Sequence, residues 1–102
     1  MSELATMPRH SVGESASAGS VLIIDDEAAI RESLETLLEM EGYSVQSAAT
    51  ADEGLTRIGS RPYDLVLLDL ALPDRNGIDL LAELHVHDPQ LAVIMITAYG
   101  TV

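Results

Sequence analysis

Aspartates lie at places in this sequence where their carboxylates could act together on one ion or substrate. Asp25 and Asp26 follow the apolar run at residues 21–24, and Asp69 follows the apolar run at residues 65–68. Carboxylates brought close together raise one another's pKa values unless a cation lies between them. Oxygen ligands in a chain without cysteine favour Mg²⁺, which binds few carboxylates and keeps several waters. A cation bound there could also offset the charge of a phosphoryl group that approaches Asp69.

Taken singly, the same residues have simpler interpretations. Asp25 and Asp26 suit the amino end of a helix, both as caps and against the helix dipole. Asp69 could cap a loop, and Thr97, which follows the apolar run at residues 91–96, is an ordinary strand residue. These separate roles do not explain why all four residues follow the ends of apolar runs.

The elements that must position these residues alternate between strand and helix patterns from Val21 onward. Short apolar runs predict strands at residues 21–24, 43–48, 65–69 and 91–97. Stripes at helical spacing predict three helices between them, which bury Ile30, Leu34, Leu37 and Leu38, then Leu55 and Ile58, then Ile78, Leu81 and Leu84. Gly42, Gly59 and the pair Asp88–Pro89 end these helices, and Thr50 and Glu53 have capping-box spacing.

This order predicts an α/β fold, a doubly wound parallel sheet with right-handed crossovers. Ligands of such open sheets bind outside the carboxyl ends of the strands, at a topological switch point. We therefore expect Asp25, Asp26, Asp69 and Thr97 to meet at one edge of the sheet.

The composition limits the classes of function. The chain has 102 residues, enough for one domain, and 17 acidic residues against 5 basic ones, all arginine, for a formal net charge of −12. Such a charge opposes binding to nucleic acids and anionic membranes. No apolar run approaches the roughly 20 residues that span a bilayer. The amino terminus has no signal-peptide pattern, so we expect a cytoplasmic protein.

The chain divides into two parts by composition. Residues 1–20 lack periodicity and end in a stretch of small polar residues, which predicts a flexible leader. Residues 21–102 carry the strand and helix patterns and form the expected domain.

The motifs of that domain resemble the receiver domain of bacterial two-component response regulators. The matching segments are VLIIDDE at residues 21–27, LVLLDL at 65–70, LPDRNG at 72–77 and IMITAYG at 94–100. They cover residues 21–102 in the family's order and spacing. The resemblance implies a flavodoxin-like topology.

It also implies roles for individual residues. Asp69 would be the phosphoacceptor, which takes a phosphoryl group from the phosphohistidine of a sensor histidine kinase. Asp25, Asp26, Asp69 and the backbone carbonyl of Ala71 would hold Mg²⁺. Thr97 would supply the hydroxyl that moves toward the phosphoryl group and switches the signalling face. An effector domain would be a further partner.

One departure from the family pattern matters. The family uses a lysine at the end of a fifth strand, followed by a fifth helix, whereas this chain stops after the fourth strand and contains no lysine. We therefore expect a receiver without its fifth strand and last helices, in which the switch is incomplete. The exposed edge of the fourth strand is expected to favour self-association.

Two other classes of function remain open. An aspartyl-phosphate hydrolase would use the same nucleophile, but it needs a general acid, sought two residues after Asp69, where Ala71 stands. A pure interaction module of the same fold would have lost phosphotransfer. The leading hypothesis is a phosphoacceptor domain in a phosphorelay, and not an enzyme.

Overall fold

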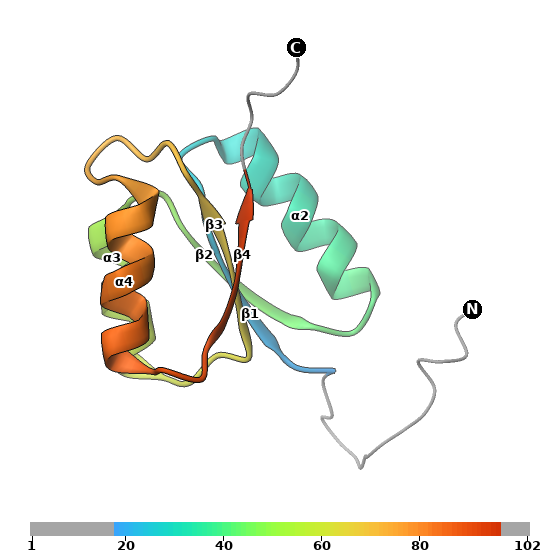
Figure 1. Ribbon diagram of the computed structural model, residues 1–102. Coiled ribbons are helices and arrows are strands. Elements are labelled where there is room, and N and C mark those ends of the chain that lie inside the picture. Colours follow the sequence, from blue (N-terminus) through green and yellow to red (C-terminus); the bar gives the residue numbers. More distant parts are fainter. Residues whose placement is uncertain (1–17, 97–102) are drawn as a thin grey trace.

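The computed structural model describes residues 18–96, which form one parallel sheet flanked by helices on both faces (Figure 1). The elements in chain order are β1 (Ser20–Ile24), α2 (Ala28–Met40), β2 (Ser44–Ala48), α3 (Ala51–Ser60), β3 (Leu65–Asp69), α4 (Gly77–His87) and β4 (Ala92–Ile96). The strand order is β2-β1-β3-β4, with all neighbours parallel. The chain reverses its direction of winding between β1 and β3, which confirms the doubly wound fold.

The main core lies between the sheet and the pair α3 and α4. Alternate residues of a strand point to opposite faces, and Leu22, Ile24, Val66 and Leu68 point to this face with no exposed surface. Leu80 and Leu84 of α4 pack against them and are equally buried. The strands that carry the aspartates are therefore fixed on this side by close packing.

The helix ends follow the sequence signals. Gly42 ends α2 with a φ of 97°, a left-handed conformation that glycine adopts without strain. The Thr50 hydroxyl accepts a hydrogen bond from the backbone N–H of Glu53 at 3.1 Å and caps α3. The Glu53 carboxylate bonds the N–H of Ala49 rather than that of Thr50, so the capping box closes one residue earlier than its usual form.

Two residues expected in the core are exposed. Ile78 in α4 and Leu37 in α2 each keep 58% of their surface accessible. In α4 the buried positions are Leu80 and Leu84, four residues apart, so the buried stripe is rotated away from Ile78. In α2 no residue is fully buried.

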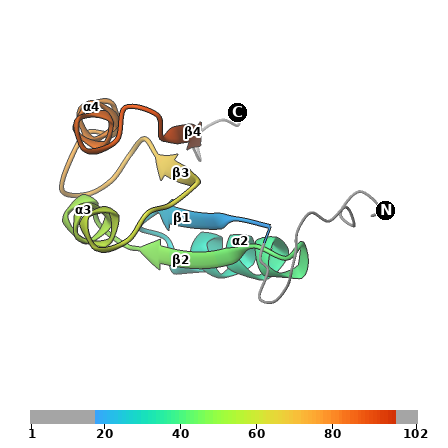
Figure 2. The ribbon, with the colours of Figure 1, turned by 90° about the horizontal axis from the view of Figure 1, so that it is seen from below.

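The face on the α2 side is only partly covered (Figure 2). Figure 2 shows α2 beside β1 and β2, while β3 and β4 lie beyond it. Ile94 of β4 pairs with Leu67 of β3 on this face and is 52% exposed. Within residues 18–96, the outer edge of β4 pairs with no other strand.

The first strand begins one residue earlier than its apolar run. Ser20 belongs to β1, and its N–H donates to Asp64 Oδ2 at 2.8 Å. The N–H of Ala18 donates to the carbonyl of Gly42 at 2.9 Å. Residues 18–20 therefore lie against the domain, although we expected them in the leader, because backbone pairing does not require apolar side chains.

In the described residues, no helix has the length and hydrophobicity required to cross a bilayer.

Candidate functional site

Carboxylates from two neighbouring strands converge at the carboxyl end of the sheet. Ile24 and Leu68 are paired in the ladder between β1 and β3, so the residues that follow them emerge at the same level. One carboxylate oxygen from each of Asp25, Asp26 and Asp69 lies within 4.8 Å of the others. The predicted meeting of these aspartates at one edge is confirmed.

Asp25 is held by contacts to its side chain and its backbone. Its N–H donates to the Ala48 carbonyl at 3.1 Å, and its Oδ1 accepts from the N–H of Glu27 at 2.9 Å. The Arg31 guanidinium donates to the Asp25 carbonyl at 2.8 Å. The Asp25 side chain therefore stabilises the turn that enters α2, while the N-cap position itself belongs to Glu27.

The electrostatics of Asp25 reflect its place in an acidic cluster. Asp25 is 5% exposed, and burial is the main cause that raises its pKa above the ordinary value, with Asp69 and Asp26 adding repulsion. The hydrogen bond from the N–H of Glu27 opposes this rise. A cation among these carboxylates would offset the repulsion from Asp69 and Asp26, which adds to the effect of burial.

The two carboxylate oxygens of Asp69 differ in their hydrogen bonds to the described residues. Asp69 is 6% exposed, and its Oδ1 accepts from the N–H of Ala71 at 3.1 Å. Among residues 18–96, no donor bonds its Oδ2. The next residue continues the ladder, because the N–H of Leu70 donates to the Ile96 carbonyl at 3.1 Å. One oxygen of a fixed carboxylate is thus available to a ligand.

The residues fit a divalent cation by their chemistry. The three carboxylates supply hard oxygen donors, and Ala71, two residues after Asp69, is exposed and adds a backbone carbonyl to the same loop. Asp26 is exposed, which leaves a path from solvent to the cluster. Thr97, the expected switch residue, lies outside the described residues, directly after Ile96, which pairs with Asp69 in the ladder.

The loop after Asp69 begins α4 with a close backbone contact. A Cβ atom on Gly77 would lie 2.8 Å from Leu70 Cα and 3.0 Å from the Asp69 carbonyl oxygen, so only glycine fits there. Asn76 accepts from the N–H of Ile78 at 2.7 Å and caps the helix. The requirement for glycine at position 77 therefore has a direct steric cause.

Some contacts around the site had no visible signal in the sequence. Arg31 bonds the carbonyl of Asp25, and Asp74 bonds the backbone of α3. Asn76 followed by glycine and an apolar helix could have been recognised as an N-cap. Neither Arg31 nor Asp74 has such a local pattern, because its partner belongs to another segment.

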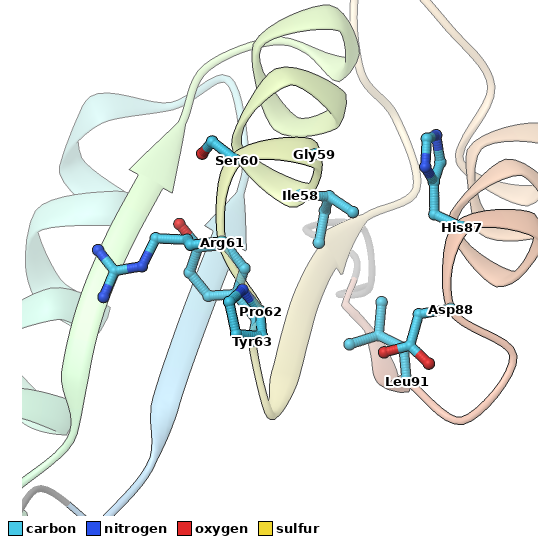
Figure 3. A pocket seen from close by; sticks show the side chains of 9 residues that line it. All are labelled: Ile58, Gly59, Ser60, Arg61, Pro62, Tyr63, His87, Asp88 and Leu91. Atoms are coloured by element: carbon cyan, nitrogen blue, oxygen red, sulfur yellow. The ribbon is translucent and has the colours of Figure 1, made fainter.

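A cavity of about 450 Å³ lies at the opposite end of the sheet (Figure 3). Its lining comes from residues 58–63, before β3, and from His87, Asp88 and Leu91, before β4. Figure 3 shows that the Arg61 side chain extends away from the space between Ile58 and His87. The cavity therefore belongs to the amino ends of the strands and is separate from the aspartates.

Comparison with known proteins extends this description. The family model of the response regulator receiver domain matches residues 21–102. The alginate biosynthesis transcriptional regulatory protein AlgB of Pseudomonas aeruginosa is 39% identical over 84 residues, which are 82% of this chain and 19% of that protein. The response regulator protein PilR of the same species is 42% identical over 80 residues, 78% of this chain and 18% of that protein. The chain thus spans about a fifth of the length of these relatives.

Solved structures agree in fold and in sequence. A CheY-like receiver domain from Methanospirillum hungatei superimposes with a TM-score of 0.79 at 43% identity, over 84% of this chain and 69% of that one. The response regulator TrrA from Thermotoga maritima, solved with Mg²⁺ and BeF, gives a TM-score of 0.75 at 36% identity, over 79% of this chain and 70% of that one. With its aspartates at the switch point of a parallel sheet, this chain belongs to the response regulator receiver domain family of phosphorelay signal transduction.

Proposed function

We propose that Asp69 is the residue on which this receiver domain accepts a phosphoryl group from a sensor histidine kinase. The observation that carries the proposal is the convergence of Asp25, Asp26 and Asp69 at the carboxyl ends of β1 and β3. Asp25 and Asp69 are both buried, and one carboxylate oxygen of each accepts a hydrogen bond from a backbone N–H. Asp69 is the proposed acceptor because it ends β3, the position that the resemblance to receiver domains gives to the phosphoacceptor.

The proposed transfer balances with the residues described. Asp69 Oδ2 forms a bond to phosphorus while the bond between phosphorus and the imidazole nitrogen of the kinase phosphohistidine breaks. The electron pair stays on the imidazole nitrogen, which takes a proton from solvent. The hydrogen bond from Ala71 to Oδ1 keeps the carboxylate in one orientation, so that Oδ2 meets the phosphorus in a reproducible geometry.

Asp25, Asp26, Asp69 and the Ala71 carbonyl are the proposed ligands of Mg²⁺. When bound, Mg²⁺ supplies positive charge that offsets the charge of the incoming phosphoryl oxygens. The three carboxylate oxygens that lie within 4.8 Å of one another support a cation at this place. The neighbour TrrA, solved with Mg²⁺ and BeF, supports the choice of metal by similarity.

The remaining assignments follow from the family. Thr97 is the proposed switch hydroxyl, and an effector domain is the proposed downstream partner, in keeping with relatives named as transcriptional regulatory proteins. Because these relatives are transcriptional regulatory proteins, the proposed location of this chain is the cytoplasm. The open edge of β4 and the exposed Ile94 support self-association of the 102-residue chain.

The two alternative functions are less well supported. A hydrolase of aspartyl phosphates would need a general acid beside the nucleophile, and Ala71 has no ionisable side chain. We therefore propose a signalling domain rather than an enzyme. An interaction module without phosphotransfer would have the same fold and the same carboxylates, so only a phosphorylation experiment separates it from our proposal.

Incubation of the 102-residue chain with acetyl phosphate tests the proposal, with intact-mass analysis as the readout. We expect addition of one phosphoryl group with Mg²⁺ and a large loss of labelling without it. Because the 102 residues contain no lysine, we expect labelling roughly a hundredfold slower than at a receiver site in which a lysine contacts the phosphoryl group. Asp69→Asn should abolish it. Labelling that survives Asp69→Asn would contradict the assignment of the site, and no labelling at all would favour the interaction module.

A further inference from the structure

The tip of the loop between β3 and α4 contacts the first turn of α3. Asp74 Oδ1 accepts from the N–H of Ala51 at 2.9 Å, and its Oδ2 accepts from the N–H of Asp52 at 3.1 Å. Asp74 is 23 residues from Ala51 in the chain. Each carboxylate oxygen thus satisfies one of the N–H groups that a helix leaves unpaired at its amino end.

Arg75 extends this contact to a second helix. Its guanidinium pairs with the Asp52 carboxylate of α3 at 3.2 Å and with the Glu83 carboxylate of α4. The Arg75 side chain is 30% exposed, the Glu83 side chain 44% and the Asp52 side chain 79%, so the ion pair with Glu83 is the better shielded of the two. The loop tip therefore joins the amino end of α3 to the middle of α4.

The base of the same loop is closed on itself. Ala71 and Asn76 form an isolated antiparallel bridge, and the N–H of Gly77 donates to the Leu70 carbonyl at 3.2 Å. Ala71 sits between this closed base and Asp69, whose Oδ1 its N–H bonds. Tip and base together fix the peptide that carries the Ala71 carbonyl.

We propose that Asp74 and Arg75 act as a clamp that holds the Ala71 carbonyl and the Asp69 carboxylate in the positions in which they bind a divalent cation. Asp74 is then a positioning residue, since it contacts α3 and neither the cation nor the phosphoryl group. This inference rests on the proposed function, because it concerns the same metal site.

The clamp has a measurable consequence. Without Asp74, the loop tip loses both backbone hydrogen bonds to α3, and the Ala71 carbonyl must be ordered when the cation binds. Groups that orient metal ligands typically change metal affinity by 10- to 100-fold. Since Ala71 supplies one backbone ligand among several donors, we expect the lower end, a loss of about tenfold.

Titration of the 102-residue chain with Mg²⁺, followed by the amide signals of Asp25, Asp26, Asp69 and Ala71, tests the clamp. Asp74→Ala should raise the dissociation constant about tenfold, and Asp74→Asn, which keeps one acceptor oxygen, should recover part of the loss. The matched control is Asp79→Asn, which removes the same charge from an exposed residue in the first turn of α4. Asp79→Asn should change the dissociation constant for Mg²⁺ by less than about twofold at physiological salt.

The possible outcomes separate the clamp from the proposed function. Wild-type binding with an unchanged constant in Asp74→Ala would overturn the clamp and leave the metal site intact. An equal loss in Asp79→Asn would also overturn it, because net charge would then be the cause. Absence of Mg²⁺ binding in the wild type would overturn both. If Asp74→Ala does not fold, Arg75→Met tests the same clamp, since it removes only the ion pairs. A several-fold loss supports the clamp, and no change contradicts it.

Discussion

On one face of the sheet, α3 and α4 bury the side chains of β1 and β3 completely, whereas on the other face α2 covers β1 and β2 and leaves β4 open. Leu68 and Leu84 on the first face have no exposed surface, while Leu37 and Ile94 on the second keep 58% and 52% of theirs. Figure 1 shows the two helix layers on opposite sides of the strands. The two faces share one sheet and differ in how much apolar surface they remove from water.

The two faces therefore contribute differently: one stabilises the fold, and the other leaves apolar surface accessible to a partner. Burial of apolar surface is the main favourable contribution to folding, so the face under α3 and α4 supports the fold and the loops at its carboxyl edge. The clamp of Asp74 and Arg75 lies on that side, because its partners belong to α3 and α4. The α2 side keeps apolar surface free for contact with another surface.

The same substitution on the two faces should have very different effects. Leu84→Ala removes a fully buried side chain from α4 and should lower the free energy of unfolding by about 2–5 kcal/mol, through lost transfer energy and a cavity. Leu37→Ala, in the exposed part of α2, should change it by less than about 0.5 kcal/mol. Urea unfolding followed by circular dichroism measures both values. Equal losses would show that α2 carries as much of the core as α4.

The open face should also control association between chains. We expect the 102-residue chain to dimerise with rising concentration through β4, since its outer edge is unpaired within residues 18–96 and an unpaired apolar edge favours pairing with another strand. Ile94→Lys should weaken this association about tenfold or more by placing a charge on the contact. Sedimentation equilibrium over a range of concentrations measures the association, with Thr36→Lys on the exposed surface of α2 as the control that adds the same single positive charge. A wild-type chain that stays monomeric would contradict the prediction.

The smallest expected effect is a pH dependence of stability that comes from Asp74, on the face covered by α3 and α4. The backbone N–H of Ala51 is the main cause that holds the pKa of Asp74 below its ordinary value. A depressed pKa in the folded state stabilises the fold above the unfolded value, about 3.9, and this contribution is lost as pH falls through the folded value. Asp74→Asn should therefore be less stable than wild type at pH 7, and the gap should close below about pH 4. Thermal melts at several pH values measure the gap, and a gap that persists in acid would contradict this origin.

The fold and the cluster of Asp25, Asp26 and Asp69 could be predicted from the sequence for a simple reason. Strand runs and helix stripes are local patterns, and parallel strands deliver the residues that follow them to one edge. Asp25, Asp26 and Asp69 could therefore be placed together without coordinates. The position of Ile78 could not, because α4 has apolar residues on more than one side and the choice of Leu80 and Leu84 depends on the sheet beneath.

The clamp lay beyond the reach of sequence patterns for a different reason. The partners of Asp74 are backbone N–H groups of α3, 22 and 23 residues away, and such groups leave no trace in residue types. Arg31 also bonds a backbone group, the carbonyl of Asp25 six residues earlier, and residue types do not reveal that contact either. Such contacts to backbone groups appear only once the chain is folded.

The central claim, that Asp69 and neither Asp25 nor Asp26 is the phosphoacceptor, is tested most directly by locating the phosphoryl group. The chain is labelled with acetyl phosphate and Mg²⁺, treated with borohydride, which reduces an acyl phosphate to an alcohol, and digested for peptide mass analysis. We predict reduction at Asp69 alone, with none in the control without acetyl phosphate. Reduction at Asp25 or Asp26 in the labelled sample would contradict it.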